Sequence, residues 1–372
     1  MEKVCGDEQQ IYMVYDYRKI IKCTGEWNIK RTVMLSEKSS RKISALSFGL
    51  FIGVMGIHTY NLEVYNLGGN SDTILSVVES FLYRFESGTC VSFFFMISGF
   101  LFFRNFDFSM LLPKYRSRGR SILIPYIIWN TVYYLYYVCM TRIPWVASIM
   151  SGGKKMPVGI IAYVQYIWSG YYTLWFLREL IWLILLTPLW YLILKRRKYY
   201  LPEVILVLMI LISLDIIHVP EISLNMYYIS GAYWGLNYKS IMGRWQNSQK
   251  SILTVVSAVG LPVIIVYGEK YIGRLWYNYL LFLLIWTAMD LLPFKSNVPW
   301  WIKCTFFYYC AHDLVLEAVE KAILLLGGKS VFMAWIDYIF APAITLMILI
   351  SAAWILRKWM PFIWKVLSGG RK

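Results

Sequence analysis

The chain carries a succession of apolar runs, each long enough to cross a lipid bilayer as a helix. About 20 apolar residues make one crossing, and without water in the bilayer every backbone hydrogen bond has to be made within the segment. The sequence therefore predicts an all-α fold, a polytopic transmembrane helix bundle of about 10 helices. The predicted spans are 43–64, 81–103, 121–140, 174–194, 200–218, 224–239, 251–268, 275–292, 304–325 and 331–356.

The composition supports a membrane environment. Hydrophobic residues make up 59% of the chain and charged residues 16%, whereas soluble domains are nearer half apolar and a quarter charged. A globule of this size still needs a charged surface, so lipid is expected to cover part of this one. The first 42 residues are polar and contain no signal-peptide pattern, because the first long apolar run begins at Ile43.

The positions of the basic residues predict the orientation of the bundle. With the N-terminus in the cytoplasm, 28 of the 37 Lys and Arg residues fall in inner segments and 6 in outer loops. Cytoplasmic loops carry such an excess in membrane proteins. One added or deleted span would move every later loop to the opposite side of the membrane. This bias therefore supports the helix count and places both termini in the cytoplasm.

The predicted organisation has three parts. Residues 1–42 form a cytoplasmic N-terminal extension in which Met34 is a possible true start, residues 43–356 form the transmembrane domain, and residues 357–372 form a cytoplasmic basic tail. Span 224–239 is short and polar, and the aromatic segment 157–171 has the character of a re-entrant or interfacial piece. No internal repeat of the transporter type is visible.

Charge and cysteine content exclude other classes of protein. The net charge is +16, but the basic residues lie between apolar runs and not on one face of a soluble domain, so no nucleic-acid partner is expected. The six cysteines include no CxxC pair, and most lie in apolar runs, where cysteine acts as a small hydrophobic residue. Neither a disulfide framework nor a metal site is predicted.

Ionisable residues inside apolar spans are candidates for function, because a charge within hydrocarbon costs free energy. His58 lies about 15 residues into the first span, which is about 22 Å along a helix, beyond the midplane. An imidazole with a pKa near neutrality is the usual base for deprotonating a hydroxyl. The alternative is a structural role, in which His58 hydrogen-bonds another helix. The other such residues are Arg84, Glu86, Arg178, Glu179, Asp290, His312, Asp313, Glu317, Glu320 and Lys321.

Five segments in order along the chain resemble one family. They are RKISALSFGLFIGVMGIH (Arg41–His58), VSFFFMISGFLFF (Val91–Phe103), KYRSRGRSILIPY (Lys114–Tyr126), YTLWFLREL (Tyr172–Leu180) and FFYYCAHDLVLE (Phe306–Glu317). Together they resemble the acyltransferase-3 family, polytopic membrane enzymes that O-acylate cell-surface carbohydrates. One position departs from the family pattern, since many members carry an arginine eleven residues before the first-helix histidine, where this chain has Ser47.

The resemblance implies an enzyme that moves an acyl group, most often acetyl, from acyl-CoA to a carbohydrate hydroxyl in the inner membrane. His58 is the expected catalytic base or acyl carrier, and Arg178 with Glu179 is expected to stabilise an oxyanion or hold the acceptor. A structural pair between Arg178 and Glu86 is the alternative. Guanidinium groups bind phosphate bidentately, so the expected CoA site comprises Arg116, Arg118 and Arg120, although any inner loop would be basic.

Three further residues are expected at a substrate cavity, namely Ser98, Trp175 and His312. Each has a structural alternative, since Ser98 and Gly99 suit close helix packing and a histidine framed by aromatic residues commonly makes a packing hydrogen bond. Polytopic architecture also fits a transporter of a polysaccharide or small molecule, or a non-catalytic member of the same fold. The sequence does not predict the acceptor, the length of the acyl group or the oligomeric state.

Overall fold

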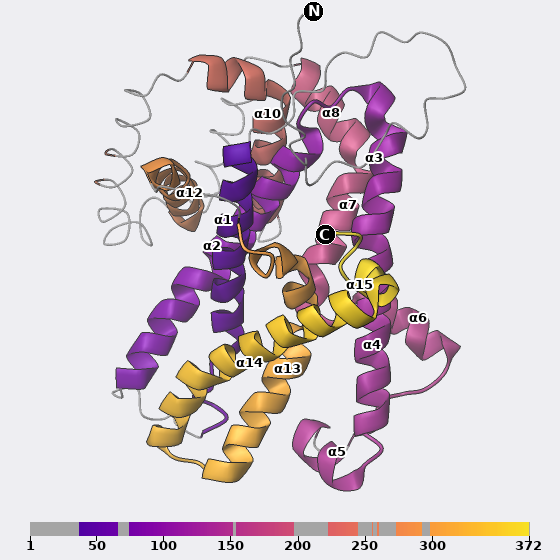
Figure 1. Ribbon diagram of the computed structural model, residues 1–372, viewed down its shortest axis with the longest axis vertical. Helices are drawn as coiled ribbons and strands as arrows, with labels where there is room; N and C mark the ends of the chain where they lie inside the picture. The colour runs from indigo at the N-terminus through magenta and orange to yellow at the C-terminus, as the bar shows by residue number, and fades with distance from the viewer. Residues whose placement is uncertain are drawn as a thin grey trace, which may run out of the picture.

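A computed structural model describes residues 37–65, 74–151, 154–196, 222–244, 255, 259, 273–291 and 298–371, and this part of the chain is helical without strands (Figure 1). The helices are α1 (Glu37–His58), α2 (Ile74–Phe103), α3 (Leu111–Arg118), α4 (Ile124–Met140), α5 (Pro144–Ser151), α6 (Ile160–Ser169), α7 (Trp175–Leu185), α8 (Thr187–Arg196), α10 (Ile222–Arg244), α12 (Gly273–Leu291), α13 (Thr305–Gly327), α14 (Val331–Trp359) and α15 (Pro361–Leu367). The short helical turns are η2 (Phe108–Met110), η3 (Gly119–Leu123), η4 (Tyr172–Leu174) and η5 (Ile302–Cys304).

Helix α2 and helix α10 pack closely because glycines face each other's backbone. A Cβ atom added at Gly99 would lie 2.1 Å from the carbonyl oxygen of Tyr228, and one added at Gly231 would lie 2.0 Å from that of Met96. Small residues allow such approach between membrane helices. Gly99 therefore serves close packing between the two helices, which was the structural alternative for the Ser98–Gly99 pair.

The centre of the fold is α13, which contacts α1, α4 and α14. Its buried face includes Phe307, Tyr308 and Cys310, and it forms a hairpin with α14. Gly328 makes the turn with a φ of 69°, a conformation that suits glycine. Ser330 then caps α14 by accepting a hydrogen bond from the amide of Met333 at 3.2 Å.

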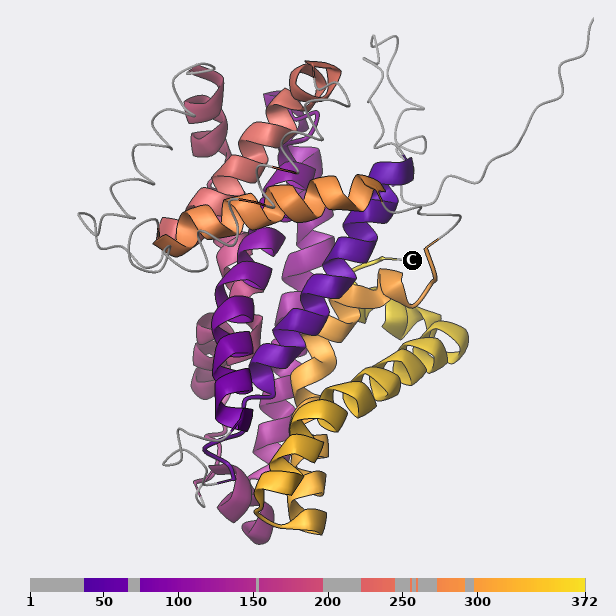
Figure 2. The ribbon, with the colours of Figure 1, turned by 90° about the vertical axis from the view of Figure 1, so that its left-hand side faces the viewer.

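Helix α12 lies across α1 and α2 and not alongside them (Figure 2). The buried Lys42 of α1 donates a hydrogen bond to the carbonyl oxygen of Trp286 at 2.6 Å, and its ammonium lies 4.2 Å from the centre of that ring. Thr89 of α2 donates to Asn278 at 2.8 Å. These polar contacts fix α12 at an angle that the apolar run 275–292 does not reveal.

The predicted spans overlap helices wherever the structure describes them, with two clear differences. The first predicted span, 43–64, is helical only to His58, where α1 ends, and residues 59–64 are not helical. The run 174–194 is not one helix, because α7 and α8 meet at Leu186 with a bend of 58°. Pro188 explains the break, since its ring clashes with the preceding turn and it has no amide hydrogen to donate. The segment 157–171 contains α6.

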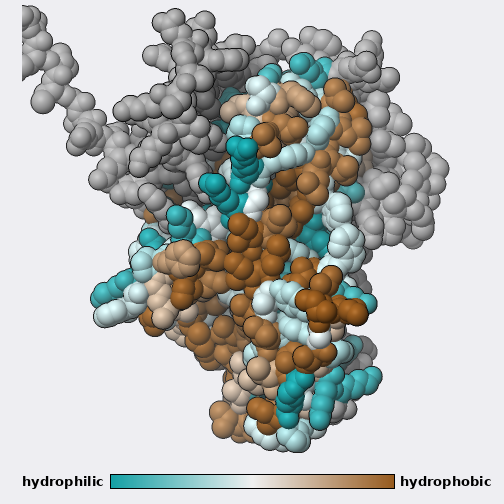
Figure 3. Space-filling model, turned by 90° about the vertical axis from the view of Figure 1, so that its right-hand side faces the viewer, coloured by the Kyte–Doolittle hydropathy of each residue, from teal (hydrophilic) through white to brown (hydrophobic). Residues whose placement is uncertain are grey.

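Three described helical stretches are long and apolar enough to cross a membrane, namely Ser39–His58, Phe108–Met140 and Val331–Trp359, and the bent pair α7–α8 makes a fourth. Large apolar side chains are exposed on them, including Leu189, Leu192 and Ile348. Figure 3 shows apolar side chains covering much of one face of the molecule. The chain is thus a helical membrane protein, and the count of ten spans and the cytoplasmic termini stay predictions.

Three predictions concern residues outside the described part of the chain. They are the alternative start at Met34, the span 200–218 and nearly all of the span 251–268.

Candidate active site

The imidazole of His58 lies at the last residue of α1, against rings from two other elements. Its ring centroid is 5.2 Å from that of His312 on α13 and 5.7 Å from that of Tyr172 in η4. The hydroxyl of Thr59 turns back to the carbonyl of Gly56 at 2.8 Å, where the helix ends. His58 as a whole residue is half-buried, and its imidazole contacts rings on two other elements.

His312 is fully buried, and its two ring nitrogens have different surroundings. Its Nδ1 lies 2.7 Å from the carbonyl oxygen of Tyr309. Since a carbonyl oxygen only accepts, Nδ1 carries the hydrogen and Nε2 carries the lone pair in the neutral ring. The buried Nε2 has no hydrogen-bond partner among the described residues. The fold therefore holds a fixed tautomer with an unused acceptor beside the ring of His58.

Asp313 follows His312 and is buried at 4% exposure. Burial of a carboxylate is costly unless hydrogen bonds replace water. Two phenols supply them: the hydroxyl of Tyr172 donates to Oδ1 at 2.6 Å and that of Tyr171 donates to Oδ2. Because the Tyr172 ring also contacts His58, this carboxylate holds a group that packs against the imidazole.

The network continues along α13 away from His58. The hydroxyl of Tyr137 on α4 lies 2.9 Å from that of Tyr171 and donates to Glu317 at 2.9 Å. Lys321 completes it with a 2.5 Å contact to the other oxygen of Glu317, one helical turn later. Asp313 and Glu317 are thus joined through phenol hydroxyls, which fixes the spacing between α4, η4 and α13.

Helix α4 positions the tyrosines of this network. Asn130 is fully buried and accepts a hydrogen bond from the amide of Tyr171 at 2.6 Å. The ring of Tyr133 stacks on that of Tyr171, with centroids 3.8 Å apart and planes 16° apart. The backbone and the ring of Tyr171 are therefore both held from α4, so its hydroxyl has little freedom to leave Asp313.

Arg178 and Glu179 lie near the start of α7 and contact each other. A guanidinium nitrogen of Arg178 is 3.0 Å from Glu179, and another donates to the carbonyl oxygen of Ser169 at 2.5 Å. Both side chains are more than a third exposed. This pair joins α7 to the end of α6 and borders the turn that carries Tyr171 and Tyr172. The Glu86 side chain, the alternative partner from sequence, lies outside the described part.

The other predicted cavity residues occupy neighbouring helices. Trp175 begins α7, with its ring 6.4 Å from that of Phe95 on α2. Ser98 is half-buried on α2, beside Gly99 and the α10 interface. The structure thus brings His58 and His312 into ring contact, while Arg178 and Glu179 contact each other.

The three arginines predicted to bind CoA lie where α3 passes into α4. Arg116 and Arg118 end α3, and Arg120 lies in the π-helical turn η3. Such turns occur often at functional sites. Arg116 and Arg120 are exposed. The guanidinium of Arg118 lies over the ring of Phe102, 5.8 Å from its centre. The three basic side chains thus lie at the turn that leads into α4, and α4 carries Tyr137 of the tyrosine network.

Sequence reasoning missed the phenols of Tyr137, Tyr171 and Tyr172. Their signal was weak, because the chain contains 30 tyrosines and membrane interfaces account for many of them. The available indication was position, since Tyr172 is the first residue of the family-like segment YTLWFLREL (Tyr172–Leu180) and Tyr171 directly precedes it.

Comparisons with known proteins complete the description of the site. A family model described as an acyltransferase domain matches residues 45–357, which include the whole histidine and tyrosine cluster. No curated protein and no solved structure matches the chain. Among the described residues, no group of three or more His, Cys, Asp or Glu side chains is arranged to hold a metal ion.

Proposed function

The chain belongs to the acyltransferase-3 family, and from this membership we propose that it transfers an acyl group from acyl-CoA to a hydroxyl of a cell-surface or lipid-linked carbohydrate. Acetyl-CoA is the proposed donor, and the inner membrane is the proposed location. One observation carries the proposal: the imidazole of the half-buried His58 contacts the buried ring of His312, whose Nε2 has no hydrogen-bond partner among the described residues.

In the proposed reaction His58 acts as general base. The acceptor hydroxyl gives its proton to the imidazole while its oxygen attacks the thioester carbonyl. The tetrahedral intermediate then releases the CoA thiolate as the carbon–sulfur bond breaks, and the proton held by His58 passes to that sulfur. The products are the ester and CoA. His312 supports this step by offering Nε2 as an acceptor for an N–H of His58, which leaves the other nitrogen of His58 for the hydroxyl.

The tyrosine network supplies orientation. Tyr172 packs its edge against His58 while its hydroxyl is held by Asp313. A carboxylate so close to the imidazole also favours the positive charge that forms when His58 takes the proton. We assign Arg178 and Glu179 a supporting role, because their pair joins the start of α7 to the end of α6 on either side of the turn that carries Tyr172.

The donor is proposed to bind at the basic turn between α3 and α4. Arg116 and Arg120 are exposed there and suit the phosphates of CoA, with Arg118 beside them. The excess of basic residues in the predicted inner segments supports a cytoplasmic location for this turn. The acyl group would then move along α4 toward His58, past Ser98 and Trp175.

Transfer of label from radioactive acetyl-CoA to extractable glycan tests the proposal, with membranes that contain the wild type, His58→Ala, His58→Gln or Cys139→Ser. Cys139 is an exposed residue and serves as the control. We expect transfer in the wild type and the control, and a loss of about 100-fold or more in both His58 variants, the size of a general-base contribution. Equal labelling in wild type and both variants would remove His58 from the mechanism. Label that stays on the protein would indicate an acyl-histidine intermediate and not direct transfer.

A further inference from the structure

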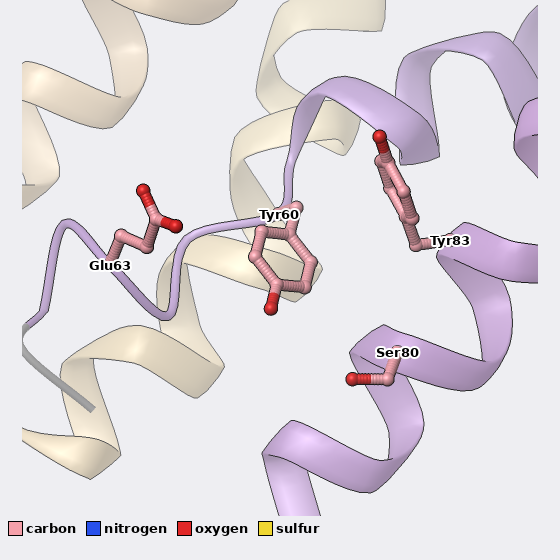
Figure 4. Close-up of a pocket in the computed structure, with 4 residues that line it drawn as sticks. All are labelled: Tyr60, Glu63, Ser80 and Tyr83. Atoms are coloured by element: carbon pink, nitrogen blue, oxygen red, sulfur yellow. The ribbon is translucent and has the colours of Figure 1, made fainter. Parts of the chain in front are cut away.

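A pocket opens two residues after His58. Tyr60 and Glu63 of the segment that follows α1 form one wall, and Ser80 and Tyr83 of α2 form the other, of a cleft of about 390 Å³ that is open to the outside (Figure 4). That volume falls within the roughly 300–1,000 Å³ of small-molecule sites. Consecutive Cα atoms are about 3.8 Å apart, so the Cα of Tyr60 lies within about 7.6 Å of that of His58. The segment that forms this wall therefore begins close to His58 along the chain.

The wall formed by the segment after α1 is held from behind by buried polar contacts. The amide of Asn61 donates to Glu79 of α2 at 3.3 Å, and its side-chain nitrogen donates to Asp337 and to the carbonyl of Ala334, both at 3.1 Å. Asn61, Glu79 and Asp337 are all less than 4% exposed. One asparagine thus ties the segment to α2 and to α14.

Apolar packing fixes the same segment at two more positions. Leu62 and Tyr65 are buried with Leu75 and Ala334 in a small hydrophobic cluster apart from the main core. The anchored residues Asn61 and Leu62 lie between the two pocket residues of this segment, Tyr60 and Glu63. The pocket is therefore preformed by the fold.

The lining residues have the chemistry of a carbohydrate site. The rings of Tyr60 and Tyr83 lie 5.5 Å apart at an angle of 52°, and both are partly exposed. Aromatic faces pack on the C–H face of a sugar ring while their hydroxyls stay available for hydrogen bonds. Glu63 accepts hydrogen bonds from sugar hydroxyls, and Ser80 both donates and accepts. An ionised carboxylate repels an anionic ligand.

We propose that this pocket binds one pyranose ring of the acceptor and selects a neutral or amino sugar over an acidic one. The inference rests on the proposed acyl transfer for the identity of this sugar as the acceptor, because one wall of the pocket is the segment that follows directly on the helix ending at His58. The binding itself follows from the lining residues and is measurable without any chemistry.

Saturation-transfer NMR on the purified full chain in detergent tests the binding, with methyl glucoside, methyl glucosaminide and methyl glucuronide as probes. We expect Tyr83→Ala and Tyr60→Ala each to weaken binding of the glucoside about tenfold, and Tyr83→Phe to change it less than about threefold, because the ring does most of the binding. Trp145→Ala, an exposed aromatic residue on α5, is the control and leaves binding unchanged. Glucoside binding that is indifferent to both alanine variants would overturn the proposal.

A separate substitution, Glu63→Gln, tests the proposed preference for neutral or amino sugars over acidic ones. The wild type is expected to bind the glucoside and the glucosaminide more tightly than the glucuronide, and Glu63→Gln is expected to narrow that difference several-fold, since it removes the repelling charge but keeps the shape. A wild type that binds the glucuronide as tightly as the glucoside would refute the selection against acidic sugars.

A separate measurement distinguishes failure of the pocket from failure of the proposed function. Release of CoA from acetyl-CoA, compared between wild-type and His58→Ala membranes that contain their own acceptor, reports the acyl chemistry without use of the methyl glycosides. If release depends on His58 while sugar binding ignores Tyr60 and Tyr83, the pocket assignment is wrong and the proposed function stands. If sugar binding depends on the tyrosines but release does not depend on His58, the pocket is a sugar site and the acyl chemistry fails.

Discussion

Substitution of Gly231 by alanine tests whether the fold depends on the close contact between α2 and α10. An ideal Cβ at Gly231 lies 2.0 Å from the carbonyl oxygen of Met96. A carbon and a carbonyl oxygen ordinarily approach no closer than about 3.3 Å, so the two helices have to separate by roughly 1.3 Å. The atom opposite belongs to the backbone, so a change of side-chain rotamer does not relieve the clash.

The magnitude follows from opposing contributions. Overpacking a close interface typically costs about 1–3 kcal/mol, and the upper end applies because the fully buried Tyr228 and Ala232 on the same helix also lose contact. Alanine in place of glycine within a helix returns about 1 kcal/mol. The net expectation for Gly231→Ala is a loss of about 2 kcal/mol. Gly49→Ala is the matched control, because its Cβ meets nothing within 4 Å and only the helix gain of about 1 kcal/mol applies.

The assay is thermal unfolding of the detergent-purified chain, followed by fluorescence-detected size exclusion after heating. We expect Gly231→Ala to lose the monodisperse peak several degrees below the wild type, and Gly49→Ala to match or exceed the wild type. Gly99→Ala, whose Cβ would meet the carbonyl oxygen of Tyr228 at 2.1 Å, should behave like Gly231→Ala. A Gly231→Ala protein as stable as Gly49→Ala would show that α2 and α10 do not approach as described.

Three further substitutions test the site and its support. His312→Asn keeps a donor for the carbonyl of Tyr309 but removes the second ring nitrogen, so acetyl transfer should fall about 100-fold at unchanged KM; a change below threefold would refute its role. Tyr172→Phe keeps the ring and removes one of the two hydrogen bonds to Asp313. The kcat, measured from initial rates, should fall about tenfold, which is the effect of one charge-assisted hydrogen bond. Lys42→Met should lower the unfolding temperature without changing KM, and a raised KM would instead connect this lysine with substrate.

The apolar runs of the sequence predicted where helices lie, because a bilayer leaves the backbone few alternatives. They did not predict the bend at Leu186, although Pro188 was there as its signal, since hydropathy does not distinguish one straight helix from two bent ones. Nor did they predict the orientation of α12, which depends on Lys42 meeting a carbonyl 244 residues away. Such contacts depend on how helices pack, which the hydropathy of each run does not report.

Within the site, the sequence identified single residues but not the contacts between them. His58 attracted attention as an ionisable side chain inside an apolar run, and the structure puts it in ring contact with His312. The phenols that hold Asp313 come from the turn before α7 and the one that holds Glu317 comes from α4, and tyrosine is too common in this chain to mark them. The tautomer of His312 depends on a backbone carbonyl, which no sequence pattern specifies.

The polarity of α13 explains why the site forms on this helix. Asp313, Glu317, Glu320 and Lys321 place three carboxyl groups and one ammonium in the middle of this helix, and a helix with charge at its middle is costly in contact with lipid. It therefore lies among α1, α4 and α14, where Tyr137, Tyr171 and Tyr172 replace water around its carboxylates. The same enclosure places His312 next to the end of α1. The requirement to keep charge away from lipid thus brings together the groups that the proposed acyl transfer uses, so substitutions that make α13 more apolar should increase its compatibility with lipid at the expense of the site.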